Sequence, residues 1–143
     1  AILKEYDFPA SQLWIEITER CRDLPISMIK KTVTAFREAG IHITMDDYGT
    51  GSSSSQMMLE LPVEGVKIDM FFVKDILEEK KKQALVIGMI NFANAADLKI
   101  CIEGIENDSL ESYLRQFDVT CFQGYHYSRS ICQDELMKLL IKP

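Results

Sequence analysis

Acidic, amide and lysine side chains collect at the ends of five short apolar segments of the sequence. The residues concerned are Glu16, Asp46, Asp47, Lys67, Glu103, Glu106 and Gln123. Adjacent aspartates stay ionised together at close range only when a cation lies beside them. Oxygen ligands without histidine are typical of Mg²⁺ or Mn²⁺ rather than of zinc. These residue types therefore indicate a carboxylate-rich site for divalent cations.

Such a site suits the hydrolysis of phosphoryl esters. A carboxylate that bridges two ions about 3.5–4 Å apart supports in-line attack on a phosphodiester. A lysine among the acids can pair with them, orient a water molecule or neutralise charge that develops on phosphate. From residue types alone, the deduction is a Mg²⁺ or Mn²⁺ site that acts on a phosphoryl ester.

Taken one at a time, the same residues have ordinary structural explanations. Asp46 and Asp47 could form a turn before Gly49, and Glu103 could cap a helix. Capping alone does not explain why an acid or amide recurs at the end of every apolar segment. In parallel α/β folds this edge of the sheet is where ligands bind.

Strand-like and helix-like segments alternate along the whole chain. Alternation or short apolar runs predict strands near 13–17, 41–45, 66–68, 98–102 and 119–122. Helical spacing predicts helices over 26–36 with a stop at Gly40, over 54–60 before Pro62, over 82–96, from 108 and from 133. We expect Leu85, Met89 and Phe92 on one face of the helix over 82–96. The alternation implies an α/β fold with parallel strands and right-handed crossovers.

Composition limits the class of protein. The chain has 143 residues, 47% of them apolar and 27% charged, and a net charge of −6. This describes a soluble globular domain, too short for a complete (β/α)₈ barrel, which needs about 200 residues or more. The acidic balance argues against binding to a DNA or RNA duplex. The longest apolar stretch, 84–93, is too short for a membrane span, and no signal peptide is visible, so we expect a cytoplasmic location.

The cysteines and histidines give no sign of a zinc site or a redox motif. Cys21, Cys101, Cys121 and Cys132 form no Cys-x-x-Cys pair, and the chain has two histidines. We expect Cys101 and Cys121, which lie in apolar runs, to be small core residues. We expect both histidines to be structural or exposed. Free thiols fit a reducing compartment.

Five strings of the sequence resemble the EAL family of cyclic di-GMP phosphodiesterases. They are Glu-Ile-Thr-Glu (16–19), Met-Asp-Asp-Tyr-Gly-Thr-Gly (45–51), Leu-Pro-Val-x-x-Val-Lys-Ile-Asp (61–69), Ile-Glu-Gly-Ile-Glu-Asn (102–107) and Phe-Gln-Gly-Tyr (122–125). Their order and spacing are family-like over nearly the whole chain. The resemblance implies a modified TIM barrel that opens one phosphodiester of cyclic di-GMP, giving linear pGpG, with two Mg²⁺ or Mn²⁺ ions.

The resemblance also implies roles for single residues. Glu16, Asp46, Asp47 and Glu103 resemble metal ligands, with Asp46 in the bridging position. The catalytic set would be Lys67 to position the nucleophilic water, Glu103 as ligand or general base, Glu106 as its neighbour near the lysine, and Gln123 against the water shell. Glu19 resembles the glutamate that holds the loop containing Tyr48, Gly49, Thr50 and Gly51, a loop that links metal binding to dimerisation.

Two ligands of the family cannot be placed in this chain. The glutamate of the Glu-x-Leu motif and an asparagine ligand would both lie upstream of Glu16. We therefore expect residues 1–143 to be the C-terminal part of an EAL domain, a partial TIM-like barrel of about five strands. The loop also departs from the family, with Ser52–Ser55 where an aromatic residue and Ser-Ser-Leu are usual. On this interpretation the intact parent is the enzyme, and the isolated chain is inactive.

Two other interpretations remain open at this stage. A degenerate EAL module could bind cyclic di-GMP or a protein partner without catalysis. A flavodoxin-like phospho-receiver domain also has five parallel strands and an Asp-Asp pair, although its lysine should follow the last strand rather than the third. An open barrel exposes two strand edges, so we expect a homodimer or other self-association, and the parent could carry an upstream sensory or GGDEF domain.

Overall fold

A single parallel sheet organises the molecule. The computed structural model describes residues 2–18, 24–50 and 54–141. The strands are β1 (Trp14–Thr18), β2 (His42–Tyr48), β3 (Gly65–Ile68), β4 (Lys99–Ile102) and β5 (Cys121–Phe122). They pair in parallel and in the order β1-β2-β3-β4-β5. All five strands lie where the sequence predicts them, although β5 has only two residues.

The strand order identifies the kind of α/β fold. Each strand lies beside its neighbour in the sequence, so every crossover moves one position in the same direction. With right-handed crossovers, this order places the connecting helices on one face of the sheet, as in a (β/α) barrel. A doubly wound receiver domain reverses direction within its sheet. The receiver interpretation is therefore wrong, and the sheet is an open part of a TIM-like barrel.

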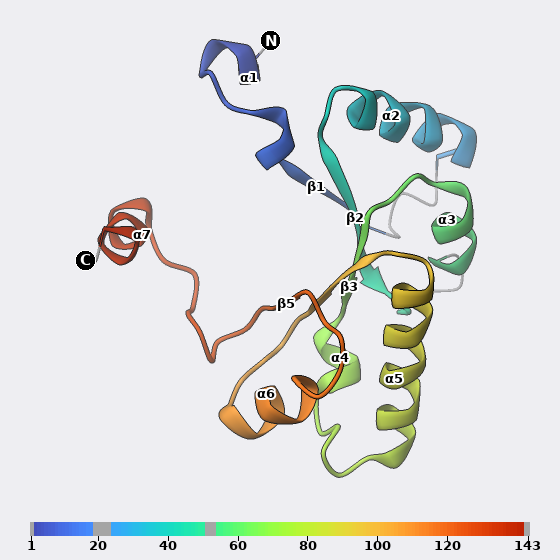
Figure 1. Ribbon diagram of the computed structural model, residues 1–143, viewed down its shortest axis with the longest axis vertical. Coiled ribbons are helices and arrows are strands. Elements are labelled where there is room, and N and C mark those ends of the chain that lie inside the picture. Colours follow the sequence, from blue (N-terminus) through green and yellow to red (C-terminus); the bar gives the residue numbers. More distant parts are fainter. Residues whose placement is uncertain (1, 19–23, 51–53, 142–143) are drawn as a thin grey trace.

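Of the helices that pack on the sheet, all but the four-residue helix Met70–Val73 follow the predicted spacing. They are α2 (Ile26–Glu38), α3 (Ser54–Glu60), α4 (Met70–Val73), α5 (Lys80–Ala95) and α6 (Asp108–Leu114). Figure 1 shows α2, α3 and α5 along one side of the strands. Gly40, with a φ of +83°, allows the chain to turn out of α2 directly into β2. No helix in the described ranges is long and apolar enough to cross a membrane.

The face of α5 that meets the sheet is only partly the one that Leu85, Met89 and Phe92 share. In α5 the core-facing residues are Val86, Met89, Ile90 and Ala93, whereas Leu85 is 50% exposed and Phe92 is 41% exposed. The helix has apolar residues around more than one side, so spacing alone did not select the face that meets the sheet. The packing of α5 against β3 and β4 determines which face of the helix is buried.

Both ends of the chain carry helices outside the main layer. The short α1 (Ile2–Glu5) and a 3₁₀ turn (Ala10–Gln12) precede β1, and α7 (Gln133–Leu140) ends the described chain. The sequence correctly predicts α7, but none of its residues is buried. Its apolar residues Leu136, Leu139 and Leu140 are 46–69% exposed. In Figure 1, α7 stands apart from the strands.

The two faces of the sheet have opposite character. On the helix-covered face, Ile43, Val66, Ile68, Ile100 and Ile102 are all 0–1% exposed and form the centre of the core. Residues with the alternate spacing point to the opposite, open face, because side chains along a strand alternate between faces. Those residues include Glu16, Thr44, Lys67, Cys101 and Cys121. The helix-covered face of the sheet is thus apolar and buried, and the open face carries polar side chains that solvent can reach.

Candidate active site

Lys67 of β3 lies at the centre of a group of carboxylates. Its Nζ atom is 2.6 Å from Oε1 of Glu103, 3.0 Å from Oε1 of Glu16 and 3.4 Å from Oδ1 of Asp46. The lysine side chain is only 9% exposed, whereas that of Glu16 is 49% exposed. Four neighbouring strands therefore bring four of the predicted residues together, and the group opens to solvent on the β1 side.

These contacts stabilise the positive charge of Lys67. Burial alone would lower the pKa of its ammonium group. The hydrogen bonds to Glu103 and Glu16 and the nearby charges of Glu103 and Asp46 outweigh burial, so the pKa lies above its ordinary value. Lys67 therefore stays protonated at neutral pH. It can donate hydrogen bonds and stabilise negative charge, but it cannot accept a proton as a base.

One carboxylate oxygen of Asp46, Oδ1, is buried without a hydrogen bond from the described residues. The 3.4 Å separation from Lys67 is an ion pair, but it is not a hydrogen bond. Buried polar oxygens in proteins are nearly always satisfied. A divalent cation would satisfy this atom, so the donor set of Glu16, Asp46 and Glu103 fits the ions that the sequence predicts.

Asp47 lies at an irregular point of β2. Its φ is +55°, and the register between β2 and β3 shifts between Met45 and Tyr48. Its carbonyl oxygen accepts hydrogen bonds from the backbone nitrogen and the hydroxyl of Thr50, at 3.1 and 2.9 Å. Successive residues of a regular strand point to opposite faces, and this irregularity relaxes that alternation for the aspartate pair. A turn from Asp47 to Thr50 is thus present, and it begins at the second of the two candidate ligands, whereas Asp46 lies within β2.

Glu106 and Gln123 lie beside this group rather than within it. Together with Glu103, they line a hollow of about 230 Å³ at the carboxyl ends of β3, β4 and β5. Glu106 makes no ion pair with Lys67 in the described part of the chain. Gln123 also lines a second hollow, of about 330 Å³, which includes Glu16 and Lys67. Gln123 therefore borders both hollows.

Two glycines allow close approaches of the chain beside Glu103 and Gln123. Gly104 follows Glu103 with a φ of +76°, a conformation that favours glycine, and a Cβ atom there would overlap Met70 of α4. A Cβ atom at Gly124 would overlap the backbone of Ile105. That contact allows the nitrogen of Ile105 to donate a hydrogen bond to the carbonyl of Gln123 at 3.1 Å. Gly124 therefore determines how closely the segments after β4 and β5 approach.

The loop after the aspartate pair is only partly described. Tyr48 is buried, and its ring stacks on that of Phe92 with 6.2 Å between centroids. Gly49 has a φ of +93° and lies against the Met89 and Phe72 side chains. These contacts join the end of β2 to α4 and α5. Glu19 and Gly51, which the family resemblance associates with this loop, lie outside the described residues.

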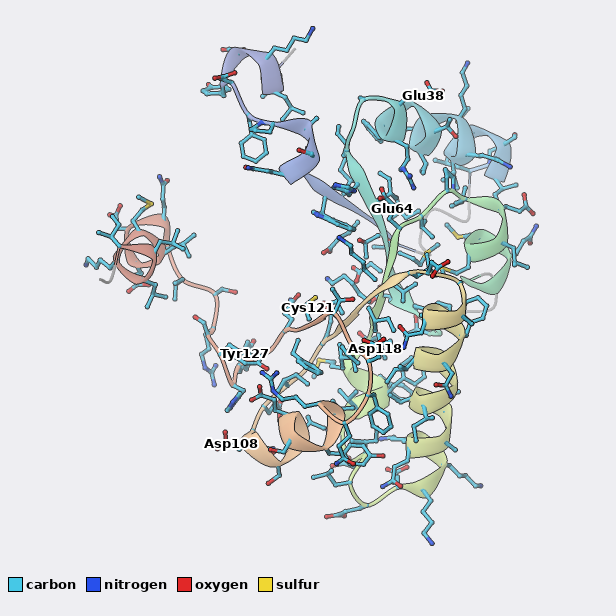
Figure 2. The ribbon with its side chains drawn as sticks, in the orientation of Figure 1. Glu38, Glu64, Asp108, Asp118, Cys121 and Tyr127 are labelled. Carbon is cyan, nitrogen blue, oxygen red and sulfur yellow. The ribbon has the colours of Figure 1, made fainter. Side chains whose placement is uncertain are left out.

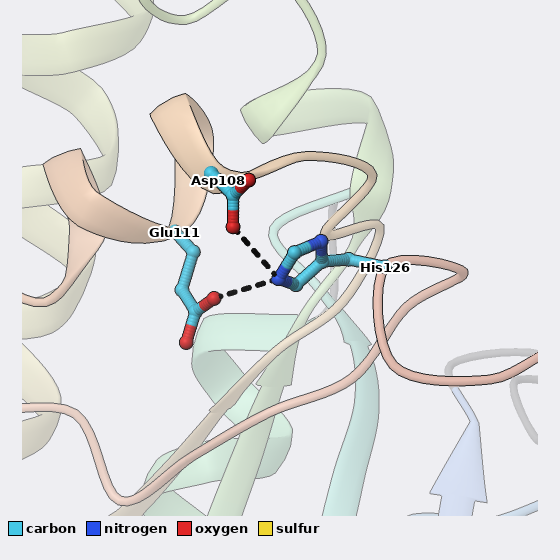
Figure 3. Close-up of side chains that lie close together, drawn as sticks. All are labelled: Asp108, Glu111 and His126. Atoms are coloured by element: carbon cyan, nitrogen blue, oxygen red, sulfur yellow. Dashed lines mark ion pairs between the residues drawn. The ribbon is translucent and has the colours of Figure 1, made fainter.

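A second polar cluster was not expected from the sequence. Nε2 of His126 lies 2.9 Å from Oε2 of Glu111 and 3.5 Å from Oδ1 of Asp108 (Figure 3). Among the described residues, this is the one group of three or more acidic, histidine or cysteine residues whose ligand atoms lie within 4.8 Å of one another. Glu111 also pairs with Arg115, which lowers the pKa of the carboxyl group. The cluster joins α6 to the segment after β5.

The expectation that Cys121 is a core residue is wrong. Cys121 of β5, labelled in Figure 2, is exposed, and its register partner Cys101 on β4 is partly buried. Burial raises the pKa of the Cys101 thiol, and a hydrogen bond with Cys121 contributes to the same shift. Alternation along the two strands places both thiols on the open face, which has no helices in the described chain.

The comparisons with known proteins identify the family. The family model described as the EAL domain matches residues 1–130. The chain belongs to the EAL domain family. Among its curated relatives, this EAL chain is 35% identical over 137 residues to the probable cyclic di-GMP phosphodiesterase PdeB of Escherichia coli, covering 96% of this chain and 26% of that protein. The first three curated relatives are covered over only 18–20% of their length.

Solved EAL structures share the arrangement described above. The EAL domain of Mycobacterium smegmatis DcpA is 30% identical, with a TM-score of 0.91 over 97% of this chain and 62% of that one. The manganese and cyclic di-GMP complex of Klebsiella pneumoniae BlrP1 is 26% identical, with a TM-score of 0.79 over 86% of this chain and 31% of that one. The expectation of an EAL domain with a partial barrel is thereby confirmed.

Proposed function

We propose that this EAL chain supplies most of the active site of a cyclic di-GMP phosphodiesterase, which hydrolyses its substrate to linear pGpG in the intact parent protein. The observation that carries the proposal is the buried Oδ1 atom of Asp46, which has no hydrogen-bond partner among the described residues. It lies 3.4 Å from Nζ of Lys67, at the edge of the sheet where ligands bind in parallel α/β folds. Relatives named as phosphodiesterases of this dinucleotide support the choice of substrate.

Glu16, Asp46, Asp47 and Glu103 would hold two Mg²⁺ or Mn²⁺ ions. Bound ions would lower the pKa of a water molecule and neutralise the phosphate. An ion at Asp46 would satisfy the oxygen that Lys67 does not reach with a hydrogen bond. A neighbour with bound manganese supports this class of ion.

Lys67 and Glu103 would have different roles toward the attacking water. Lys67 is protonated, so it orients the water through a hydrogen bond and stabilises charge on the phosphate. Glu103, 2.6 Å from Lys67, is then the candidate base that accepts the water proton. Water oxygen bonds to phosphorus, the bond from phosphorus to the 3′ oxygen breaks, and that oxygen takes up a proton. Gln123, which borders both hollows, would hold the water shell, with Glu106 beside it.

Paramagnetic broadening tests the cation site without any need for turnover. Added Mn²⁺ should broaden the amide NMR signals around Asp46 and Glu103 before those of the rest of the chain. Asp46→Asn should raise the Mn²⁺ concentration for equal broadening at least about tenfold, because a ligand charge is lost. Asp118→Asn, a change far from these side chains near the start of β5, is the matched control. Equal broadening in both variants would contradict the proposal.

A second candidate is a module that binds cyclic di-GMP or a protein partner without catalysis. It is favoured by Lys67, whose ammonium group already pairs with Glu16, Asp46 and Glu103. We expect the isolated 143-residue chain to release no detectable pGpG in excess Mn²⁺. Calorimetry with the dinucleotide, with and without Mg²⁺, distinguishes the candidates when it is combined with an assay of the parent. Binding without turnover in the parent favours the module.

A further inference from the structure

Two cysteines far apart in the sequence lie side by side on the open face of the sheet. Cys101 of β4 and Cys121 of β5 are direct partners in the parallel register. Both line the same hollow of about 330 Å³ on that face. On its other side, Cys101 is the register partner of Lys67. The pair therefore borders the lysine that gathers the carboxylates.

The surroundings allow the two sulfur atoms to be joined. A disulfide needs Cα atoms about 4.4–6.8 Å apart, and neighbouring strands are separated by about 4.8 Å. β5 contains only Cys121 and Phe122 and pairs on one side, with β4. A strand this short at the sheet edge can adjust to the geometry that a disulfide demands. Cys121 is also exposed, so an oxidant can reach it.

The position of each cysteine ties the pair to the candidate active site. Glu103 follows Cys101 by two residues, and Gln123 follows Cys121 by two residues. Two residues is the repeat of side chains on one face of a strand. A bond between the sulfur atoms would thus act on the two strand ends that carry Glu103 and Gln123. It would change the hollow of about 230 Å³ that these two residues line.

We propose that Cys101 and Cys121 form a modification site, a dithiol that a hydroperoxide closes to a disulfide. In the first step the sulfur of Cys121 attacks hydrogen peroxide, the O–O bond breaks, and Cys121 becomes a sulfenic acid as water is formed. In the second step the sulfur of Cys101 attacks that of Cys121 and displaces a second water. Two thiols are oxidised by two electrons, and one peroxide is reduced to two waters. Thiol reductants reverse the change.

Peptide mapping after mild peroxide treatment tests the proposal directly. Trypsin cleavage after Lys99, Arg115 and Arg129 separates the cysteines into peptides 100–115 and 116–129, with Cys132 in peptide 130–138 and Cys21 in peptide 21–22. The reduced 143-residue chain should label at four thiols with N-ethylmaleimide. After one equivalent of peroxide, it should label at two. Peptides 100–115 and 116–129 should be joined, with the loss of two hydrogen atoms, and dithiothreitol should release them.

Two serine variants serve as the matched pair. Cys121→Ser should abolish the link between the two peptides, and Cys132→Ser, a change outside the sheet, should leave it intact. Oxygen addition at single cysteines without a link, or a link that involves Cys132, would overturn the proposal. The readout needs neither metal nor substrate. The peptide-mapping result therefore does not depend on the phosphodiesterase proposal. The test of the phosphodiesterase proposal likewise does not depend on whether the disulfide forms.

Discussion

Nζ of Lys67 lies 2.6 Å from Oε1 of Glu103, and this contact is the shortest of the three that surround the lysine. The ammonium group is the positive charge around which carboxylates from three other strands gather. Its position on a strand that is buried along its whole length leaves it little freedom to move away. The stability of the protein and the occupancy of the site are therefore coupled through one side chain.

Lys67→Met should show that coupling. The variant keeps the length of the side chain but leaves three carboxylates without their cation, so we expect the free energy of unfolding to fall by about 3 kcal/mol. Millimolar Mn²⁺ should then raise the melting temperature of the variant more than that of the unaltered chain, because the ion replaces the lost charge. Thermal unfolding with and without Mn²⁺ measures both effects. An equal Mn²⁺ response in the two proteins would contradict the idea of a shared cation site.

Glu111 should make the fold sensitive to acid. The hydrogen bond from Arg115 is the main cause of its lowered pKa, and the charges of Arg115 and His126 act in the same direction. A carboxyl group with a lowered folded-state pKa contributes stability above its ordinary value of 4.5, and that contribution is lost as the pH falls through the folded-state value. Glu111→Gln should therefore lower stability at pH 7 and flatten its decline below pH 4.5. Urea unfolding from pH 7 to pH 3 measures this, with Glu135→Gln on the exposed α7 as the control.

A pair of glycine substitutions should have opposite effects. Gly124→Ala places a Cβ atom on the backbone of Ile105, so we expect a loss of about 1–3 kcal/mol and a displaced Gln123. Gly88→Ala adds a methyl group in open space within α5 and should gain about 0.5–1 kcal/mol. Chemical denaturation gives both values. A neutral Gly124→Ala would show that the close approach of β4 and β5 is not required.

The open sheet should make the chain self-associate. Within the described residues, β1 and β5 each pair on one side only, and no helix covers the open face of the sheet. Unpaired strand edges are sites for association with another chain. We expect sedimentation velocity to show a dimer or larger species that grows with concentration. A monomer at all concentrations would mean that the edges are protected in solution.

The sequence predicted which side chains would gather around Lys67, because the end of each strand can be recognised separately in the pattern. Glu16, Asp46, Lys67 and Glu103 each follow from the place where an apolar run stops, and parallel pairing then requires that they meet. The apolar face of α5 could not be predicted, since Leu85 and Phe92 are as apolar as Val86 and Ile90. The pairing of Cys101 with Cys121 depends on register, which an alternating pattern does not specify. The contact of His126 with Glu111 depends on the path of the chain after β5, about which the spacing gives no information.

Because each strand pairs only with its neighbours in sequence, the sheet is a linear series of interfaces, and its stability should vary along that series. Opening β5 breaks one short interface, whereas opening β3 breaks two longer ones. Amide hydrogen exchange should thus be fastest in β5 and slowest in β2 and β3. The candidate active site then has a more stable part, which contains Lys67 and Asp46, and a less stable part near Gln123, which unfolds locally first.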